Sequence, residues 1–166
     1  MDGDVENSNL RAVEEPVSAE KNLLSESKIL VVDDNKALRD ITKIFMGRQG
    51  VPEESITVAS SAEEAEDLLK SGEVYSGIYM DNSMGGKFGK DALIEFRKKY
   101  HRMFLALATT DGFSEEERDQ LLKDGIDLFI DKSEGAGIPG VKNFLTAVNK
   151  FMNEQATLNQ SQPNDI

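Results

Sequence analysis

The sequence contains no cysteine and a single histidine, His101. Without cysteine the chain cannot form disulfides, thiolate nucleophiles or cysteine-based zinc sites. One imidazole cannot build a metal site from several histidines, and any Ser–His catalytic scheme would have to use His101. That residue lies in a basic run from Arg97 to Arg102, which is typical of a solvent-exposed helix end.

An excess of positive charge and long apolar runs are also missing. The formal net charge is -12 at pH 7, and no basic patch stands out, which argues against a direct nucleic-acid partner. No apolar run approaches the roughly 18 residues that a membrane span requires. The N-terminus lacks the basic-then-apolar order of a secretory signal. We therefore expect a cytoplasmic, acidic protein that binds neither nucleic acid nor membrane.

Composition divides the chain into three parts. Residues 1–27 carry seven acidic and two basic side chains, with no aromatic residue and no sustained periodicity, which predicts a disordered leader. Residues 28–153 contain the regular apolar patterns of one domain. Residues 154–166 are polar and are predicted to form a tail.

The central part alternates short apolar segments with amphipathic ones. The predicted strands cover residues 29–32, 56–59, 77–80, 104–108 and 126–130, and a helical pattern follows each of them. The first helix is expected to bury Leu38, Ile41 and Phe45, and the last to run from Val141 to about Asn153. Strict alternation predicts a doubly wound (βα)5 fold, in which helices cover both faces of a parallel five-stranded sheet.

Two adjacent carboxylates, Asp33 and Asp34, directly follow the first predicted strand. One interpretation is a solvated turn in which Asp34 or Asn35 caps the next helix. The other is a cation site, because neighbouring acids repel each other unless a positive charge lies between them. Mg²⁺ is the natural candidate for a site of oxygen ligands.

Polar side chains also end the third, fourth and fifth predicted strands. In a parallel sheet these strand ends share one edge, so residues far apart in sequence converge there. Carboxylates can hold Mg²⁺, one of them can act as a nucleophile toward phosphorus, and a hydroxyl and an ammonium group can bind phosphoryl oxygens. The set consists of Asp33, Asp34, Asp81, Thr109 or Thr110, and Lys132.

The segment Met80-Asp81-Asn82-Ser83-Met84-Gly85-Gly86-Lys87-Phe88-Gly89, with the acidic pair and Lys132, resembles the receiver domains of response regulators (CheY-like). The resemblance covers roughly residues 28–153 and implies a flavodoxin-like, three-layer fold. It implies that Asp81 accepts a phosphoryl group, while Asp33, Asp34, Asp81 and the backbone carbonyl of Ser83 bind Mg²⁺. It further implies that Lys132 binds phosphate and that Phe129 is an aromatic switch residue.

The phosphate-binding hydroxyl stays open between Thr109 and Thr110. Counting back from Lys132 by the spacing of the family favours Thr110, and counting forward from Gly89 favours Thr109. Thr110 would leave Asp111 directly beside the phosphoryl group, where like charges repel, and this favours Thr109 weakly.

Three departures from the family pattern concern the output more than the chemistry. Gly85 and Ser133 stand where the family has proline, so the first loop gains mobility and the Lys132–Ser133 bond is expected to be trans. Residues 133–140 are longer and richer in glycine than usual. The surface formed by the fourth helix, fifth strand and fifth helix is where such proteins commonly bind their targets.

The resemblance implies a stand-alone receiver that takes a phosphoryl group from a sensor histidine kinase or a histidine phosphotransfer protein. It would catalyse only its own phosphorylation and dephosphorylation, carry no output enzyme domain, and signal by binding a downstream protein. One alternative is a receiver-fold interaction module that works independently of phosphorylation. A second alternative, an aspartyl-nucleophile phosphatase, requires a second acid two residues after the first, and Asn35 occupies that position.

Overall fold

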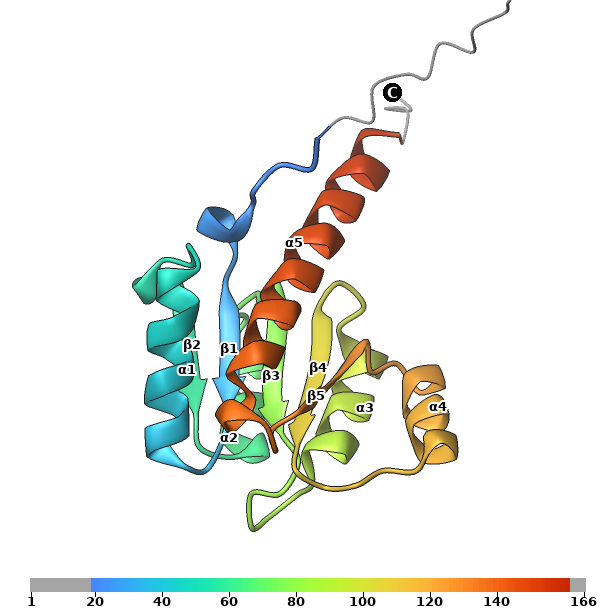
Figure 1. Ribbon diagram of the computed structural model, residues 1–166. Helices are drawn as coiled ribbons and strands as arrows, with labels where there is room; N and C mark the ends of the chain where they lie inside the picture. The colour runs from blue at the N-terminus through green and yellow to red at the C-terminus, as the bar shows by residue number, and fades with distance from the viewer. Residues whose placement is uncertain (1–18, 162–166) are drawn as a thin grey trace, which may run out of the picture.

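The computed structural model describes residues 19–161, which contain a five-stranded, all-parallel sheet with the strand order β2-β1-β3-β4-β5 (Figure 1). β2 lies beside β1 at one edge of the sheet, and β3 lies on the other side of β1, so the strand order reverses after β2. The doubly wound fold predicted from the alternation is therefore confirmed. The strands are β1 (Ile29–Val32), β2 (Ile56–Ala59), β3 (Gly77–Asp81), β4 (Phe104–Thr109) and β5 (Leu128–Asp131).

Helices cover both faces of the sheet, and alternate residues of each central strand face opposite layers. On β1, Leu30 and Val32 join the core beneath α2, α3 and α4, whereas Ile29 and Val31 join the core beneath α1 and α5. All of β1 and β3 is buried, which explains their uninterrupted apolar sequences. The helices are α1 (Lys36–Arg48), α2 (Ala62–Lys70), α3 (Gly89–Lys99), α4 (Glu115–Lys123) and α5 (Ile138–Gln160).

Side-chain caps determine where three helices begin. The side chain of Asn35 accepts a hydrogen bond from the backbone N–H of Leu38, so Asn35 rather than Asp34 caps α1. Ser61 caps α2 in the same way. Ser114 and Glu117 form a reciprocal capping box at α4. The caps place each helix start within a few residues of the carboxyl end of the preceding strand.

Two local predictions were wrong. In α1 Phe45 packs half-buried against the core, as predicted, but Ile41 is 46% exposed, and the fully buried residues are Thr42 and Met46 because this stripe of the helix faces the sheet. β5 begins at Leu128, not at residue 126. Gly125, with φ +110°, and Ile126, whose N–H donates to the Leu121 carbonyl, instead close the end of α4 in a Schellman motif.

The described parts of the predicted leader and tail, residues 19–27 and 154–161, are structured. Of the predicted leader, residues 1–18 lie outside the described residues, but Leu23 donates its backbone N–H to Asn149 Oδ1 of α5 at 2.7 Å, and Leu24 packs against the core. Helix α5 continues to Gln160 through most of the predicted tail, whose residues 162–166 are not described. Within residues 19–161, no helix is long and apolar enough to cross a membrane.

Candidate functional site

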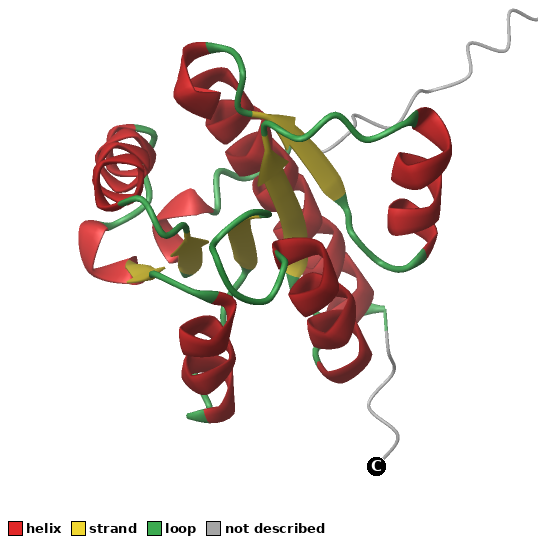
Figure 2. Cartoon of the chain, turned by 90° about the horizontal axis from the view of Figure 1, so that it is seen from below, coloured by secondary structure: helices red, strands yellow, loops and turns green. Residues whose placement is uncertain are grey.

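The predicted site residues meet at the carboxyl edge of the sheet, which Figure 2 shows from below. Asp33 follows β1, Asp81 is the last residue of β3, and Lys132 follows β5. These three residues are 48 or more positions apart, and the register of the parallel strands brings them together. The backbone N–H of Lys132 donates to the carbonyl of Thr109, which holds the end of β5 beside β4.

Lys132 lies between two buried carboxylates. Its Nζ donates to Asp33 Oδ2 at 2.6 Å and to Asp81 Oδ1 at 2.9 Å. Only 8% of the Lys132 side chain is exposed, with 4% for Asp33 and 12% for Asp81. The ammonium group is therefore an internal cation with two short, charge-assisted bonds, which fix its position.

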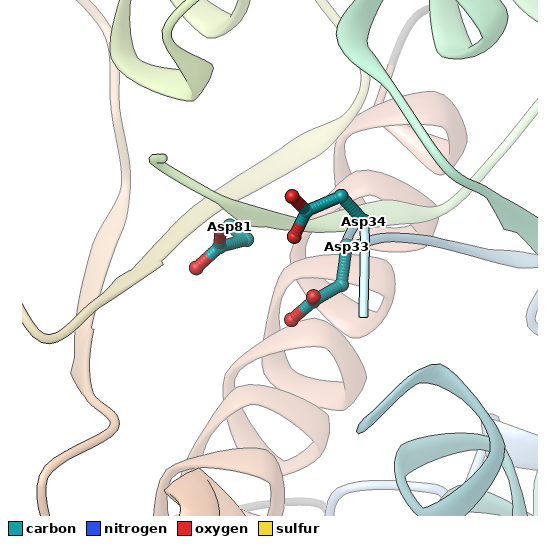
Figure 3. A group of neighbouring side chains, drawn as sticks. All are labelled: Asp33, Asp34 and Asp81. Atoms are coloured by element: carbon teal, nitrogen blue, oxygen red, sulfur yellow. The ribbon is translucent and has the colours of Figure 1, made fainter. Parts of the chain in front are cut away.

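Asp34 completes an acidic cluster. Asp33, Asp34 and Asp81 each offer a carboxylate oxygen, and these oxygens lie within 4.8 Å of one another (Figure 3). Asp34 is exposed, while Asp33 and Asp81 are buried, so the cluster opens toward solvent on the Asp34 side. The other oxygen of Asp33, Oδ1, accepts the backbone N–H of Asn35 at 2.8 Å, which orients this carboxylate at the start of α1.

The neighbouring charges and the burial of the cluster shift the pKa values of Asp81 and Lys132. Burial raises the pKa of the Asp81 carboxyl above its ordinary value, Lys132 lowers it again, and the charges of Asp33 and Asp34 raise it further. Burial alone would lower the pKa of Lys132, but its bonds to Asp33 and Asp81 outweigh burial and raise it. Three carboxylates face the ammonium group of Lys132, and the guanidinium of Arg39 donates to the backbone carbonyl of Asp33 at 2.6 Å, so the negative charges still outnumber the positive ones.

This donor set fits a hard divalent cation. Three carboxylates supply oxygen ligands, one side of the cluster is open to water, and Mg²⁺ typically keeps several waters while binding one or two carboxylates. A cation here would offset the charges of Asp33 and Asp34, which add to the effect of burial on the pKa of Asp81. The alternative of a solvated turn is correct that Asn35 caps α1, but it does not explain why Asp33 and Asp81 are buried against Lys132.

The loop after β3 approaches the site very closely. A Cβ added to Gly89, the first residue of α3, would lie 2.1 Å from the carbonyl oxygen of Asp81. Gly89 also donates its N–H to the carbonyl of Asn82, which closes the loop at its base. Glycine at this position is therefore what allows α3 to start against the end of β3.

Sequence reasoning did not identify two polar residues beside the site, Asn82 and Asp111. Asp111 Oδ2 accepts hydrogen bonds from Asn82 Nδ2 at 2.9 Å and from Ser83 Oγ at 3.0 Å. These bonds lower the pKa of Asp111. Asp111 entered the sequence analysis only as an unfavourable charge, because its partners lie 28 and 29 positions away and no local pattern signals them.

The two candidate threonines occupy different environments. Thr109 is the last residue of β4 and is 7% exposed, and its Oγ1 accepts the backbone N–H of Asp111 at 2.8 Å. Thr110 is exposed. Because Thr109 ends the strand beside the one that ends in Asp81, its hydroxyl belongs to the buried part of this edge, and that of Thr110 does not.

Phe129 lies on β5, half-buried, with its ring 6.2 Å from that of Phe113. A cavity of about 180 Å³ is lined by Phe129 and the loop after β4, and Thr109, Arg118 and Asp131 also contribute to its lining. Phe129 and Thr109 therefore border the same open space.

The departures from the expected pattern have visible consequences. Residues 19–161 contain no cis peptide bond, so the Lys132–Ser133 bond is trans, as the missing proline predicts. In the glycine-rich segment that follows, Gly137 has φ +81°, and a Cβ there would lie 3.0 Å from the hydroxyl of Tyr79. Glycine thus lets this segment pack directly beside Lys132 before α5 begins.

A family model described as the response regulator receiver domain matches residues 29–137. This range includes every predicted site residue and ends just before α5. The match covers more than half of the chain.

Solved structures show the same fold. The receiver domain of Francisella response regulator 1452 has a TM-score of 0.64 at 24% identity, covering 78% of this chain and 98% of that one. A two-component response regulator from Clostridium difficile has a TM-score of 0.65 at 21% identity, with coverages of 76% and 98%. The response regulator TrrA from Thermotoga maritima, solved as wild type in complex with Mg²⁺-BeF, has a TM-score of 0.61 at 26% identity, covering 74% and 98%.

Proposed function

Since the chain belongs to the response regulator receiver domain family, we propose that Asp81 accepts a phosphoryl group from a phosphohistidine on a partner protein. The donor would be a sensor histidine kinase or a histidine phosphotransfer protein. One observation carries the proposal: Asp81 is buried at the end of β3, 2.9 Å from Lys132 Nζ and inside a cluster of three carboxylates.

The covalent step requires an accessible carboxylate oxygen on Asp81. Lys132 holds Oδ1, and no side chain among residues 19–161 donates to Oδ2, which leaves that oxygen for the attack on phosphorus. A new O–P bond forms as the N–P bond of the phosphohistidine breaks, and the electron pair of that bond stays on the imidazole nitrogen. Lys132 then pairs with a phosphoryl oxygen in place of part of its contact with the carboxylate.

Asp33, Asp34, Asp81 and the backbone carbonyl of Ser83 would hold Mg²⁺ at this site. When bound, the ion supplies positive charge that stabilises the transferring phosphoryl group. Support comes from the donor chemistry of the cluster and from TrrA, which was solved with Mg²⁺-BeF. Asp33 is prearranged for this role by its bond from Asn35.

The signal would pass through Thr109 and Phe129. Thr109 is the better candidate for the phosphate-binding hydroxyl, because it is buried at the strand end and Thr110 is exposed. Movement of Thr109 toward the phosphoryl group would leave more space for Phe129 to turn inward from Phe113. That motion would alter the surface of α4, β5 and α5, where a downstream protein would bind.

We assign no other catalytic activity to the domain: it would catalyse its own phosphorylation and dephosphorylation only. The test is incubation with acetyl phosphate and Mg²⁺, followed by intact-mass measurement, for wild type and Asp81→Asn. The exposed Asp119→Asn on α4 is the matched control. We expect Mg²⁺-dependent phosphorylation of wild type and Asp119→Asn, and none of Asp81→Asn.

Equal labelling of Asp81→Asn would refute Asp81 as the acceptor. If partner binding were the same for wild type and Asp81→Asn, with and without phosphodonor, the alternative of a phosphorylation-independent interaction module would replace this proposal.

A further inference from the structure

Two loops leave the carboxyl edge beside the proposed acceptor. The loop of residues 82–88 joins β3 to α3, and the loop of residues 110–114 joins β4 to α4. Asp111 belongs to the second loop, and its side chain is exposed, yet its carboxylate is bonded to the first loop. Two hydrogen bonds to protein groups hold this carboxylate in one position, although it is exposed to solvent.

Asp111 is hydrogen-bonded to residues beside Asp81 and to the proposed phosphate-binding Thr109. Its Oδ2 accepts from Asn82 Nδ2 at 2.9 Å and from Ser83 Oγ at 3.0 Å, the two residues that follow Asp81. Its backbone N–H donates to Thr109 Oγ1 at 2.8 Å. One residue thus links the proposed metal loop with the proposed phosphate-binding hydroxyl.

Asn82 makes this link rigid on the β3 side. It is 3% exposed, its N–H donates to the carbonyl of Ala108 at 3.1 Å, and its carbonyl accepts from Gly89 at 2.9 Å. Its Oδ1 accepts from the N–H of Lys90 at 3.1 Å. All four polar groups of its backbone and side-chain amide are therefore hydrogen-bonded, which fixes the position of Asn82. A displacement of Asp111 would strain its bond to Asn82 and would also move Ser83.

The bond to Thr109 has a consequence for its hydroxyl. A hydroxyl can accept and donate at once, and here the N–H of Asp111 occupies an acceptor position of Thr109 Oγ1. The hydroxyl proton therefore points away from that N–H, and Thr109 is also among the hydrogen-bonding groups that lower the pKa of Asp111. The orientation of this group depends on where the loop of residues 110–114 holds Asp111.

We propose that Asp111 is a positioning residue that couples the loop of residues 82–88 to the Thr109 hydroxyl through its hydrogen bonds to Asn82 and Ser83. Binding of a cation or phosphoryl group near Asp81 would thereby change the position of the loop of residues 110–114 before Phe129 moves. The roles of the coupled groups rest on the proposed function, whereas the link between the loops does not.

Hydrogen exchange on the whole protein tests this link, with Asp111→Ala and Asp111→Asn compared. Both bonds end on Oδ2 alone, so the amide oxygen of asparagine can replace it. In metal-free protein we expect Asp111→Ala to speed exchange about fivefold at the hydrogen-bonded amides of residues 82, 89 and 90 as well as in 109–113, because both side-chain hydrogen bonds of Asp111 are lost. Asp111→Asn should stay near wild type, as should the control Asp119→Ala.

A second measurement adds Mg²⁺ and beryllofluoride. In wild type and Asp111→Asn, we expect these ligands to slow exchange in residues 109–113. In Asp111→Ala that response should be lost, while Mg²⁺ affinity changes less than about threefold, because no proposed ligand atom has been removed.

The inference is overturned if Asp111→Ala alters only its own loop, or if Asp111→Ala and Asp111→Asn behave alike. Failure of wild type to bind Mg²⁺ would instead refute the proposed function. The metal-free comparison of residues 82, 89 and 90 still decides whether Asp111 links the two loops.

Discussion

The carboxyl edge of the sheet has two halves that differ in packing. Around β1 and β3, Asp33 and Asp81 are buried and Lys132 binds both. Only glycine fits at position 89, where α3 begins against the carbonyl oxygen of Asp81. Around β4 and β5, a cavity of about 180 Å³ is lined by Phe129 and by the loop of residues 110–114. Of the residues of α4, Leu121 alone is buried. A covalent step needs fixed groups, whereas a switch needs two arrangements of similar free energy.

Glycine substitutions should reveal the largest difference between the halves. Gly89→Ala places a Cβ 2.1 Å from the Asp81 carbonyl and should lower the free energy of unfolding by about 3 kcal/mol. Gly112→Ala, in the loop before α4, meets no atom within 4 Å and should change it by less than about 0.5 kcal/mol. Urea denaturation measures both, and equal losses would contradict the contrast in packing.

Lys132→Met should have the next largest effect. It leaves Asp33 and Asp81 buried without their cation, and we expect a loss of about 2 to 3 kcal/mol in metal-free buffer. Millimolar Mg²⁺ should restore part of this loss, because a bound cation replaces the missing charge. No recovery with Mg²⁺ would argue against a cation site at the acidic cluster.

The ion pairs of Lys132 with Asp33 and Asp81 also predict how the free energy of unfolding depends on pH. The pKa of Lys132 is raised in the folded protein, so its contribution to stability is complete below the ordinary value of 10.5. It is lost as the pH rises through the higher folded value. The stability difference between wild type and Lys132→Met should therefore be constant from neutral pH to pH 10.5 and shrink above it, which denaturation at a series of alkaline pH values checks.

Leu121→Ala tests how weakly the other half is held. We expect a loss of about 2 kcal/mol, and exchange of α4 amides should quicken more than that of β1 or β3 amides, since Leu121 is the buried anchor of this helix. Leu122→Ala is the matched control, because Leu122 is 45% exposed, and it should cost less than about 0.5 kcal/mol. Uniform quickening across the sheet would mean that α4 does not open separately.

The threonines allow the finest distinction. Thr109→Ala should weaken beryllofluoride binding roughly tenfold in the presence of Mg²⁺, because a hydroxyl donor to a charged group is lost. Thr110→Ala should change it by less than about twofold, since Thr110 is exposed. Fluorine NMR titration measures both affinities, and the reverse order would transfer the phosphate-binding role to Thr110.

Local sequence signals were sufficient for much of this molecule. The apolar run Ile29–Val32 predicts a strand, which is β1, and Ser61 and Ser114 cap α2 and α4 through residues close to them in the sequence. Both depend on neighbours in the chain: strand burial on the apolar run and helix capping on a side chain three residues from its partner. The ordered sequence of acids and lysine at strand ends also predicts which residues converge, because parallel strands share one edge.

Tertiary structure alone decided the rest. Which face of α1 is buried depends on its rotation against the sheet, so Ile41 is exposed although the helical pattern suggested otherwise. The choice of Asn35 as the cap and the burial of Thr109 depend on backbone geometry at single residues. The link from Asp111 to Asn82 joins positions 29 apart, and hydrogen bonds between such distant positions form only once the sheet places both loops together.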